Sequence, residues 1–238
     1  MSTLNLLYKD RYDINESISV CIPTVEQILE DEDTYNNMVF LLTASPIDML
    51  VQLDEAGIDF TTVSDFDLFL MIFEELKTRD TSLIFGDLNL SNFEYAVDGE
   101  SEKVVLVDRE NDIVINNRVH GQIAATLRKI HHLEKNRQKP GNKEAKEYMI
   151  ERAKIKAKRR KNIKEDSQLE SLIIAMVSTE QFKYNFEEVK KLTIYQFNES
   201  VRQIIKKVEY DNRMHGIYSG TINAKDLNKD DLNWLTHK

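Results

Sequence analysis

The sequence predicts a helix-rich α+β fold, with small antiparallel β elements in the N-terminal half and a helical C-terminal half. Glycine (7) and proline (3) are scarce among the 238 residues, which favours long regular elements over the many turns of a sandwich or propeller. Aromatic residues are plentiful (10 Phe and 9 Tyr), so the chain can build a core and global disorder is not expected. Short alternating apolar runs end near residue 115, whereas helical spacing of apolar residues continues to residue 210.

The beginning of the chain predicts a β-hairpin. Leu4–Leu7 and Ser17–Ile22 have the composition of short strands, and the polar segment Lys9–Glu16 between them supplies the turn. Pro23 then ends the second strand. Cys21, the single cysteine of the sequence, lies in this strand, and we interpret it as a buried small hydrophobic residue rather than a nucleophile.

A series of helices follows the hairpin. Thr24 with Gln27 three residues later is a capping box, and Ser45-Pro46 places an N-cap before a proline at the first helical position. Gly57 supplies a stop. The predicted helices are Val25–Glu30, Thr34–Ala44, Ile47–Ala56 and, capped by Ser64, Asp65–Thr78. The last carries an aromatic stripe that we assign to the core: Phe66, Phe69, Leu70, Phe73 and Leu76.

Strand signals separated by polar turns come next and predict a meander. They are Ser82–Phe85, Phe93–Val97, Val104–Val107 and Ile113–Ile115. Four aspartates lie at or near these turns: Asp87, Asp98, Asp108 and Asp112. Their spacing matches no EF-hand loop, and Asp is favoured at turns for local hydrogen bonding, so no metal site is expected.

The second half of the sequence is predicted to be helical. Asn116 or Asn117 caps a long helix from Arg118 to about Asn136. Its histidines, at positions 120, 131 and 132, lack the spacing and partners of a zinc site and are expected at the surface or at a cap. Two further helices follow. Ser167–Ser178 is apolar on more than one face, which places it at the centre of a bundle, and Thr193–Tyr210 is amphipathic.

The net charge of −9 conceals a strong asymmetry. Residues 1–100 carry 21 acids against 4 bases, whereas residues 128–164 carry 15 bases against 4 acids. Such a chain can hold its basic segment on its acidic part, or it can offer that segment to an acidic partner or to nucleic acid. We predict three parts: an acidic α+β domain (1–138), a basic helix or linker (139–165) and a helical C-terminal domain (166–238).

The basic segment predicts an exposed helix over residues 143–164. Its run Lys154–Lys161 indicates nucleic-acid binding in isolation, yet it lacks aromatic residues to stack on bases, and no recognisable nucleic-acid module surrounds it. Ala145, Met149, Ala153 and Ala157 make only a thin apolar stripe. The candidate partner-binding residues are Lys154, Lys158, Arg159, Arg160, Lys161 and, near the C-terminus, Trp234, which is also interpreted as an anchor into the body.

The sequence lacks the motifs of the common catalytic classes. It has no glycine-rich phosphate loop, G-x-S-x-G, H-E-x-x-H, C-x-x-C or kinase signature. We therefore expect no catalytic residue, no cofactor and no enzymatic activity. The N-terminus does not have the pattern of a signal peptide, and no stretch approaches the ~18 uncharged apolar residues of a membrane span. No membrane partner is expected, and the protein is expected in the cytosol where it is made.

Several blocks of the sequence resemble a mostly uncharacterised family from phages and prophages of Gram-positive bacteria. The resemblance spans most of the chain, and the blocks that carry it are Tyr35–Ala44, Glu110–Ile115, Lys139–Lys143, Ser167–Val177, Gln181–Tyr184, Ile194–Phe197, Gly216–Thr221 and Asp231–Leu235. Members of that family tend to lie among tail genes. No catalytic motif comes with the resemblance.

The resemblance implies a role in tail morphogenesis, in the host cytoplasm or in the virion. The first interpretation is a non-catalytic assembly chaperone that binds phage tail proteins. The alternative is a minor structural component of the tail or baseplate. A third interpretation, from another class, is a phage regulator that binds nucleic acid through the helix at 143–164.

Overall fold

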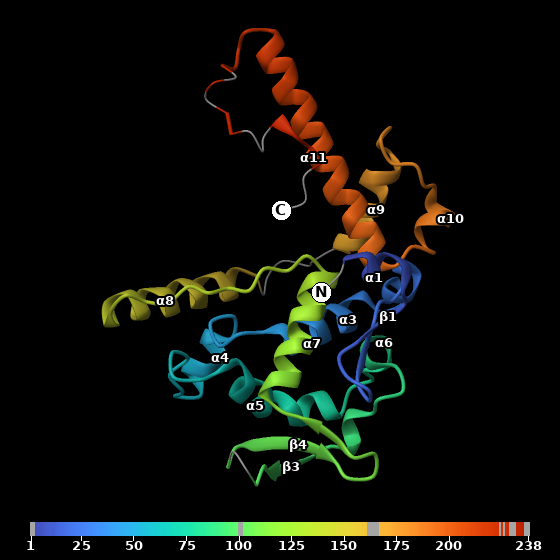
Figure 1. Ribbon diagram of the computed structural model, residues 1–238. Coiled ribbons are helices and arrows are strands. Elements are labelled where there is room, and N and C mark those ends of the chain that lie inside the picture. Colours follow the sequence, from blue (N-terminus) through green and yellow to red (C-terminus); the bar gives the residue numbers. More distant parts are fainter. Residues whose placement is uncertain are drawn as a thin grey trace.

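The computed structural model describes residues 3–99, 102–160, 167–223, 225, 227–228 and 232–235. Figure 1 shows a body of helices above a small sheet, a helix (α8) that extends to one side, and a long helix (α11) that rises away from the body. The predicted α+β fold is confirmed, since small antiparallel sheets lie in the N-terminal half and helices make up the C-terminal half.

The predicted hairpin forms, but from other residues. Leu4–Leu7 lies within a helix, α1 (Thr3–Tyr8), and the strand β1 (Arg11–Asp13) comes from the segment predicted as the turn. It pairs antiparallel with β2 (Ser19–Cys21). Residues 3–8 are helical because of tertiary contacts. Helix α1 packs against α11, and the Leu7 carbonyl accepts a hydrogen bond from the distant Gln196 Nε2 at 2.8 Å. Such contacts override the local strand propensity of Leu4–Leu7.

Two of the four helices of the front half begin at their predicted caps. The Thr24–Gln27 capping box opens α2, and Ser64 with Asp67 forms a second capping box at the start of α5. Ser45 instead bonds Asp48 through both its backbone N–H and its hydroxyl, which forms a turn and delays the next helix. The bounds are α2 (Val25–Leu29), α3 (Glu32–Thr43), α4 (Leu50–Glu55) and α5 (Asp65–Lys77), and Gly57 follows α4 with φ +73°.

Three of the four predicted strands form the meander. Ser82–Phe85 is the exception, because it forms a single helical turn, α6, that buries Ile84 and Phe85. After the 3-10 helix η1 (Leu90–Asn92) come β3 (Glu94–Val97), β4 (Val104–Asp108) and β5 (Ile113–Ile115), paired in that order. Asp108 accepts hydrogen bonds from the backbone N–H groups of Glu110 and Asn111, so this aspartate closes a turn as predicted.

Helix α7 (Asn117–Ile130) begins at the predicted cap, Asn116, and ends six residues before the predicted Asn136. The end is a Schellman motif: His132 adopts φ +54°, and the Leu133 N–H bonds the Arg128 carbonyl at 2.8 Å. No Gly marks this position, which explains why the sequence pattern missed it. Residues 133–140 after it have no regular secondary structure.

The histidines correct a second expectation. His131 caps α7, as predicted, and its Nε2 lies 2.9 Å from the Tyr35 hydroxyl. His120 is not at the surface: its side chain is 2% exposed and stacks on the ring of Phe69, with centroids 4.3 Å apart. The phenylalanine stripe of α5 therefore packs on an imidazole as well as on aliphatic side chains.

The rest of the chain comprises α8 (Lys143–Arg160), α9 (Gln168–Val177), α10 (Phe186–Val189) and α11 (Ile194–Tyr218). One face of α9 is buried while Ile174, on the other, is half exposed, so α9 lies at the side of the core rather than at the centre of a bundle. Leu169, Ile173 and Phe197 join the same apolar cluster as Leu6 and Phe73.

The buried histidines predict an acid-sensitive fold. Burial lowers the pKa of His120 and of His131 from 6.5 to about 4, so between these values the unfolded chain binds more protons than the folded one. Stability is then fully present above pH 6.5 and falls as the pH drops towards 4, by about 1–2 kcal/mol per histidine near pH 5.

Urea unfolding followed by circular dichroism across this range checks the prediction. The variant His120→Gln keeps a polar group that can bond the backbone of Leu42, as His120 does, but carries no charge at any pH. We expect it to lose less stability on acidification than the wild type. Parallel pH profiles for the two proteins would contradict the assignment.

Candidate partner-binding surfaces

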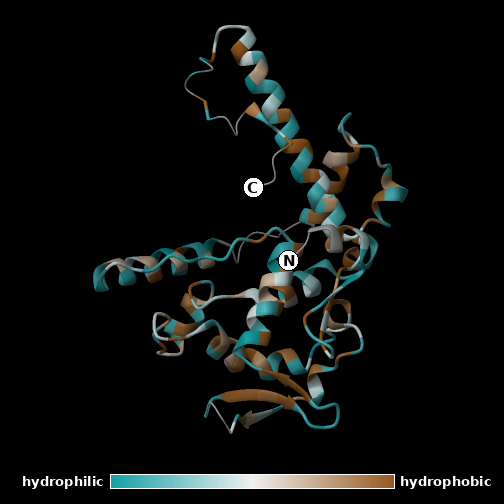
Figure 2. Ribbon diagram, in the orientation of Figure 1, coloured by the Kyte–Doolittle hydropathy of each residue, from teal (hydrophilic) through white to brown (hydrophobic). Residues whose placement is uncertain are grey.

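Helix α8 packs along one face on the acidic front half of the chain, so the basic segment is held within the molecule rather than projecting from it. Met149, Ile150 and Ala153 contact a small apolar cluster of Ala44, Ile47, Leu50, Leu53, Phe60 and Leu68. The predicted thin stripe is therefore the covered face, and α4 is the helix beneath it. Figure 2 shows how polar the rest of α8 is.

Two lysines of α8 reinforce this contact with ion pairs. Lys146 Nζ lies 2.6 Å from Asp59 Oδ2, and Lys154 Nζ lies 2.6 Å from Asp54 Oδ2. The bond from Lys146, together with those from Thr61, lowers the pKa of Asp59 to about 2. Both pairs are partly exposed, and such pairs stabilise little on their own, so the apolar stripe is the main attachment. Lys154, one of the predicted partner-binding residues, is therefore already paired with Asp54 of the same chain.

The end of α8 places the other basic candidates away from this contact. Lys158 and Arg159 are exposed. Arg160 is the last residue of the helix, with a side chain outside the described part, and Lys161 lies outside the described residues altogether. The predicted helix over 143–164 is therefore seen as far as residue 160. A free basic end remains after the packed portion.

A second surface is the far part of α11, here called the arm (residues 202–218). Val201 is the last buried residue of α11, and the helix continues for about 25 Å beyond it at 1.5 Å per residue. Figure 1 shows this part rising away from the body. Ile205 and Val208 belong to the apolar side of the helix predicted as amphipathic over Thr193–Tyr210, yet they are exposed (52% and 37%) because they lie beyond the buried part of α11.

The end of the arm reverses the chain through two glycines. Gly220 adopts φ +75°, and the Thr221 N–H bonds the Gly216 carbonyl at 2.9 Å, which forms a Schellman motif. A Cβ at Gly216 would lie 2.6 Å from Ile222 Cδ1, so glycine lets the returning chain approach α11 closely. The block Gly216–Thr221 is therefore a structural reversal.

The returning chain brings Trp234 back to the arm. Trp234 is half-buried, and Lys207 Nζ lies 5.7 Å from its ring centroid in a cation–π contact. Lys207 also bonds Asp211 and sits over the Tyr210 ring. Trp234 is thus attached to α11 rather than to the main core. Its neighbours Leu232 and Leu235 are exposed.

The described residues contain no group of His, Cys, Asp and Glu that could hold a metal ion. None of the helices within the described ranges is both long and apolar enough to cross a membrane. Two surfaces carry the predicted partner-binding residues: the exposed Lys158 and Arg159 near the end of α8, and the arm with its returning chain.

The fold and these surfaces define a helix-rich α+β protein with a projecting C-terminal arm. Residues 158–238 match the family model described as YomV second domain, a phage-associated family. The matched range contains α9, α10, α11 and the returning chain. This match fits a phage protein. No curated protein and no solved structure matches the chain.

Sequence reasoning missed the arm as a separate surface. It ended the last helix near Tyr210 and included Ile205 and Val208 in one amphipathic pattern, because periodicity alone cannot show where burial ends. The glycines at 216 and 220 were the available signal, since a Gly pair after a long helix marks a reversal.

The packing of α8 predicts different effects for two matched substitutions. Met149→Asp introduces a charge at the covered face, so it should detach α8 and raise backbone hydrogen exchange over residues 143–160. Ile155→Asp introduces the same group at an exposed position and should leave exchange unchanged. Equal exchange in both variants would show that α8 is not held through this face.

The reversal at the end of the arm can be followed through Trp234, the single tryptophan of the sequence. Gly220→Ala strains the left-handed position by about 1 kcal/mol, so it should loosen the returning chain. We expect a red-shifted tryptophan emission and stronger quenching by acrylamide. Gly141→Ala, at an unstrained glycine with open space around it, is the control and should leave both signals unchanged.

Proposed function

We propose that this protein is a non-catalytic phage morphogenesis factor, an assembly chaperone that binds phage tail proteins through its arm. The observation that carries the proposal is the exposed apolar surface of the arm beyond Val201. A helix gains little from extending into solvent with Ile205 and Val208 uncovered, whereas a partner that covers them removes apolar area from water.

Other exposed side chains extend this surface along the C-terminal part of the chain. Large apolar residues on α9, on the loop before α10, on α10, on the arm and on the returning chain remain exposed: Ile174, Tyr184, Phe186, Ile205, Val208, Tyr218, Leu232 and Leu235. All lie within the range that matches the phage-associated family. The location of these residues supports binding of another protein by this part of the chain.

The body supports the same role by supplying a rigid base. The beginning of α11 is fixed in the core through Ile194, Tyr195 and Phe197. A helix that is fixed at its base and exposed at its far end can bind an apolar segment of a tail protein. Such binding acts by mass action and needs no catalytic step. The expectation that the protein has no enzymatic activity is part of this proposal.

Affinity purification from cells that produce the phage tests the role of the arm. The tagged wild type should retrieve a tail protein, identified by mass spectrometry. Ile205→Asp combined with Val208→Asp should lower recovery about tenfold, because the partner would bury two carboxylates. Asn212→Asp with His215→Asp adds the same groups at exposed polar positions and should retain recovery. Equal recovery with both double variants would refute binding through the arm.

Mass spectrometry of purified particles separates the chaperone from the structural alternative. A chaperone is released, so the protein should be absent from particles. Its presence at a fixed copy number would make it a component of the tail or baseplate. Retrieval of nucleic acid in place of a tail protein, lost on neutralising Lys158 and Arg159, would favour the regulator.

A further inference from the structure

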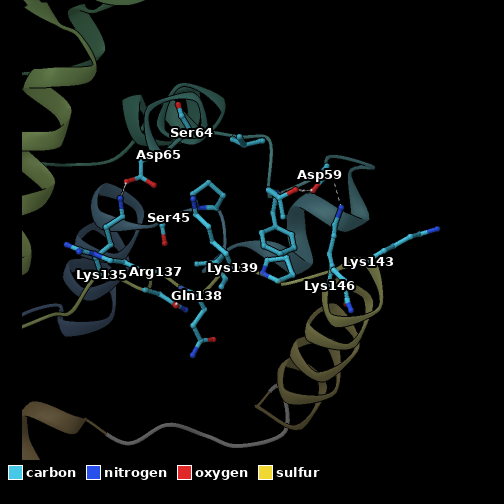
Figure 3. Close-up of a pocket in the computed structure, with 18 residues that line it drawn as sticks. Ser45, Asp59, Ser64, Asp65, Lys135, Arg137, Gln138, Lys139, Lys143 and Lys146 are labelled. Atoms are coloured by element: carbon cyan, nitrogen blue, oxygen red, sulfur yellow. Dashed lines mark hydrogen bonds and ion pairs between the residues drawn. The ribbon is translucent and has the colours of Figure 1, made fainter.

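A pocket separates the irregular segment after α7 from the region between α3 and α5. Its volume is about 790 Å³, within the range of about 300–1,000 Å³ that is common for ligand sites. One wall is residues 135–140 together with the start of α8, and the other comes from residues 45–47 and 59–65. Figure 3 shows the two walls, joined by an ion pair at each end, Lys135–Asp65 and Lys146–Asp59.

The pocket carries an excess of positive charge. Its lining includes five cationic residues against two carboxylates, Asp59 and Asp65: Lys135, Arg137, Lys139, Lys143 and Lys146. Of these, Lys143 points away from the pocket and pairs with Glu147 (Figure 3). The two end pairs neutralise both carboxylates. Arg137 and Lys139 form no ion pair with any residue that the structure describes. The N-terminus of α8, capped by Asn142 on the same wall, adds partial positive charge.

The backbone of this wall lacks partners. Between the bond from Leu133 N to Arg128 O and that from Lys146 N to Asn142 O, the described residues show no backbone–backbone hydrogen bond from this segment. One side-chain bond, from the Gln138 N–H to Asn136 Oδ1, occurs in it. Most of its N–H and C=O groups are therefore available, as in an edge strand.

Apolar side chains complete the lining: Pro46, Ile47, Phe60, Val63 and Pro140. Phe60 is buried, so its ring offers no platform for stacking a base. A phosphodiester backbone also has acceptors but no donors, so it would leave the carbonyl groups of the segment unpaired. A peptide main chain has both, and acidic side chains on it would meet Arg137 and Lys139.

We infer that this pocket binds an extended, acidic peptide segment of another protein, paired with the backbone of residues 134–140 and held by Arg137 and Lys139. The peptide alternates acidic residues, which meet the cations, with small apolar residues, which contact Ile47 and Val63. This site is separate from the arm. One molecule would then hold two segments, an apolar one at the arm and an acidic one here.

Fluorescence polarisation of the full chain with a labelled peptide of alternating glutamate and valine tests the inference. The wild type should bind saturably and more weakly as salt rises. Arg137→Gln with Lys139→Gln should weaken binding at least about tenfold, since charge-assisted bonds are lost. Lys183→Gln with Lys191→Gln removes two exposed charges elsewhere and should leave affinity unchanged.

Two altered probes test the chemistry. Glutamine in place of each glutamate should abolish binding, and N-methylation of alternate peptide nitrogens should weaken it because donors to the segment are lost. No binding by the wild type, or equal loss in both double variants, would overturn the inference. So would stronger binding of single-stranded DNA that depends on Arg137 and Lys139. The arm variant Ile205→Asp/Val208→Asp should bind the peptide normally. The peptide-binding inference and the proposed function of the arm are therefore tested independently of each other.

Discussion

The structure depends on one apolar core that both ends of the chain must complete. Leu6 of α1 and Phe197 of α11 are fully buried in the same cluster as Phe73 of α5. Backbone bonds from Val25 N to Leu192 O and from Ile194 N to Pro23 O join the two ends. Because these contacts hold α11 at its beginning only, the same constraint that fixes the fold leaves the arm outside it.

The acidic front half of the chain neutralises only part of the basic segment. Lys135, Lys146 and Lys154 each pair with an aspartate of the acidic front half. These surface pairs orient the basic segment more than they stabilise it, since an apolar stripe on α8 supplies the attachment. The cations beyond them stay available, at the pocket wall and at the end of α8. The basic segment therefore packs on the front half of the chain through α8 and still leaves several cations exposed.

The sequence predicted elements well where a side chain acts on its own backbone. The predicted capping residues Thr24, Ser64 and Asn116 all cap their helices, and the three-stranded meander forms in the predicted order. It failed where distant contacts decide: Leu4–Leu7 is helical against α11, and the expected strand Ser82–Phe85 is a buried turn of helix. The burial of His120 likewise depends on the facing phenylalanines of α5.

The sequence by itself determined the fold class, most helix starts, the polarity of α8 and its thin apolar stripe, because caps and periodicity act over a few residues. Tertiary structure alone decided that this stripe packs on α4, that Val201 is the last buried residue of α11, and that residues 135–140 line a pocket without backbone–backbone hydrogen bonds within the described part of the chain. Whether an apolar or charged side chain is covered depends on what lies opposite it, and those neighbours come from far along the chain.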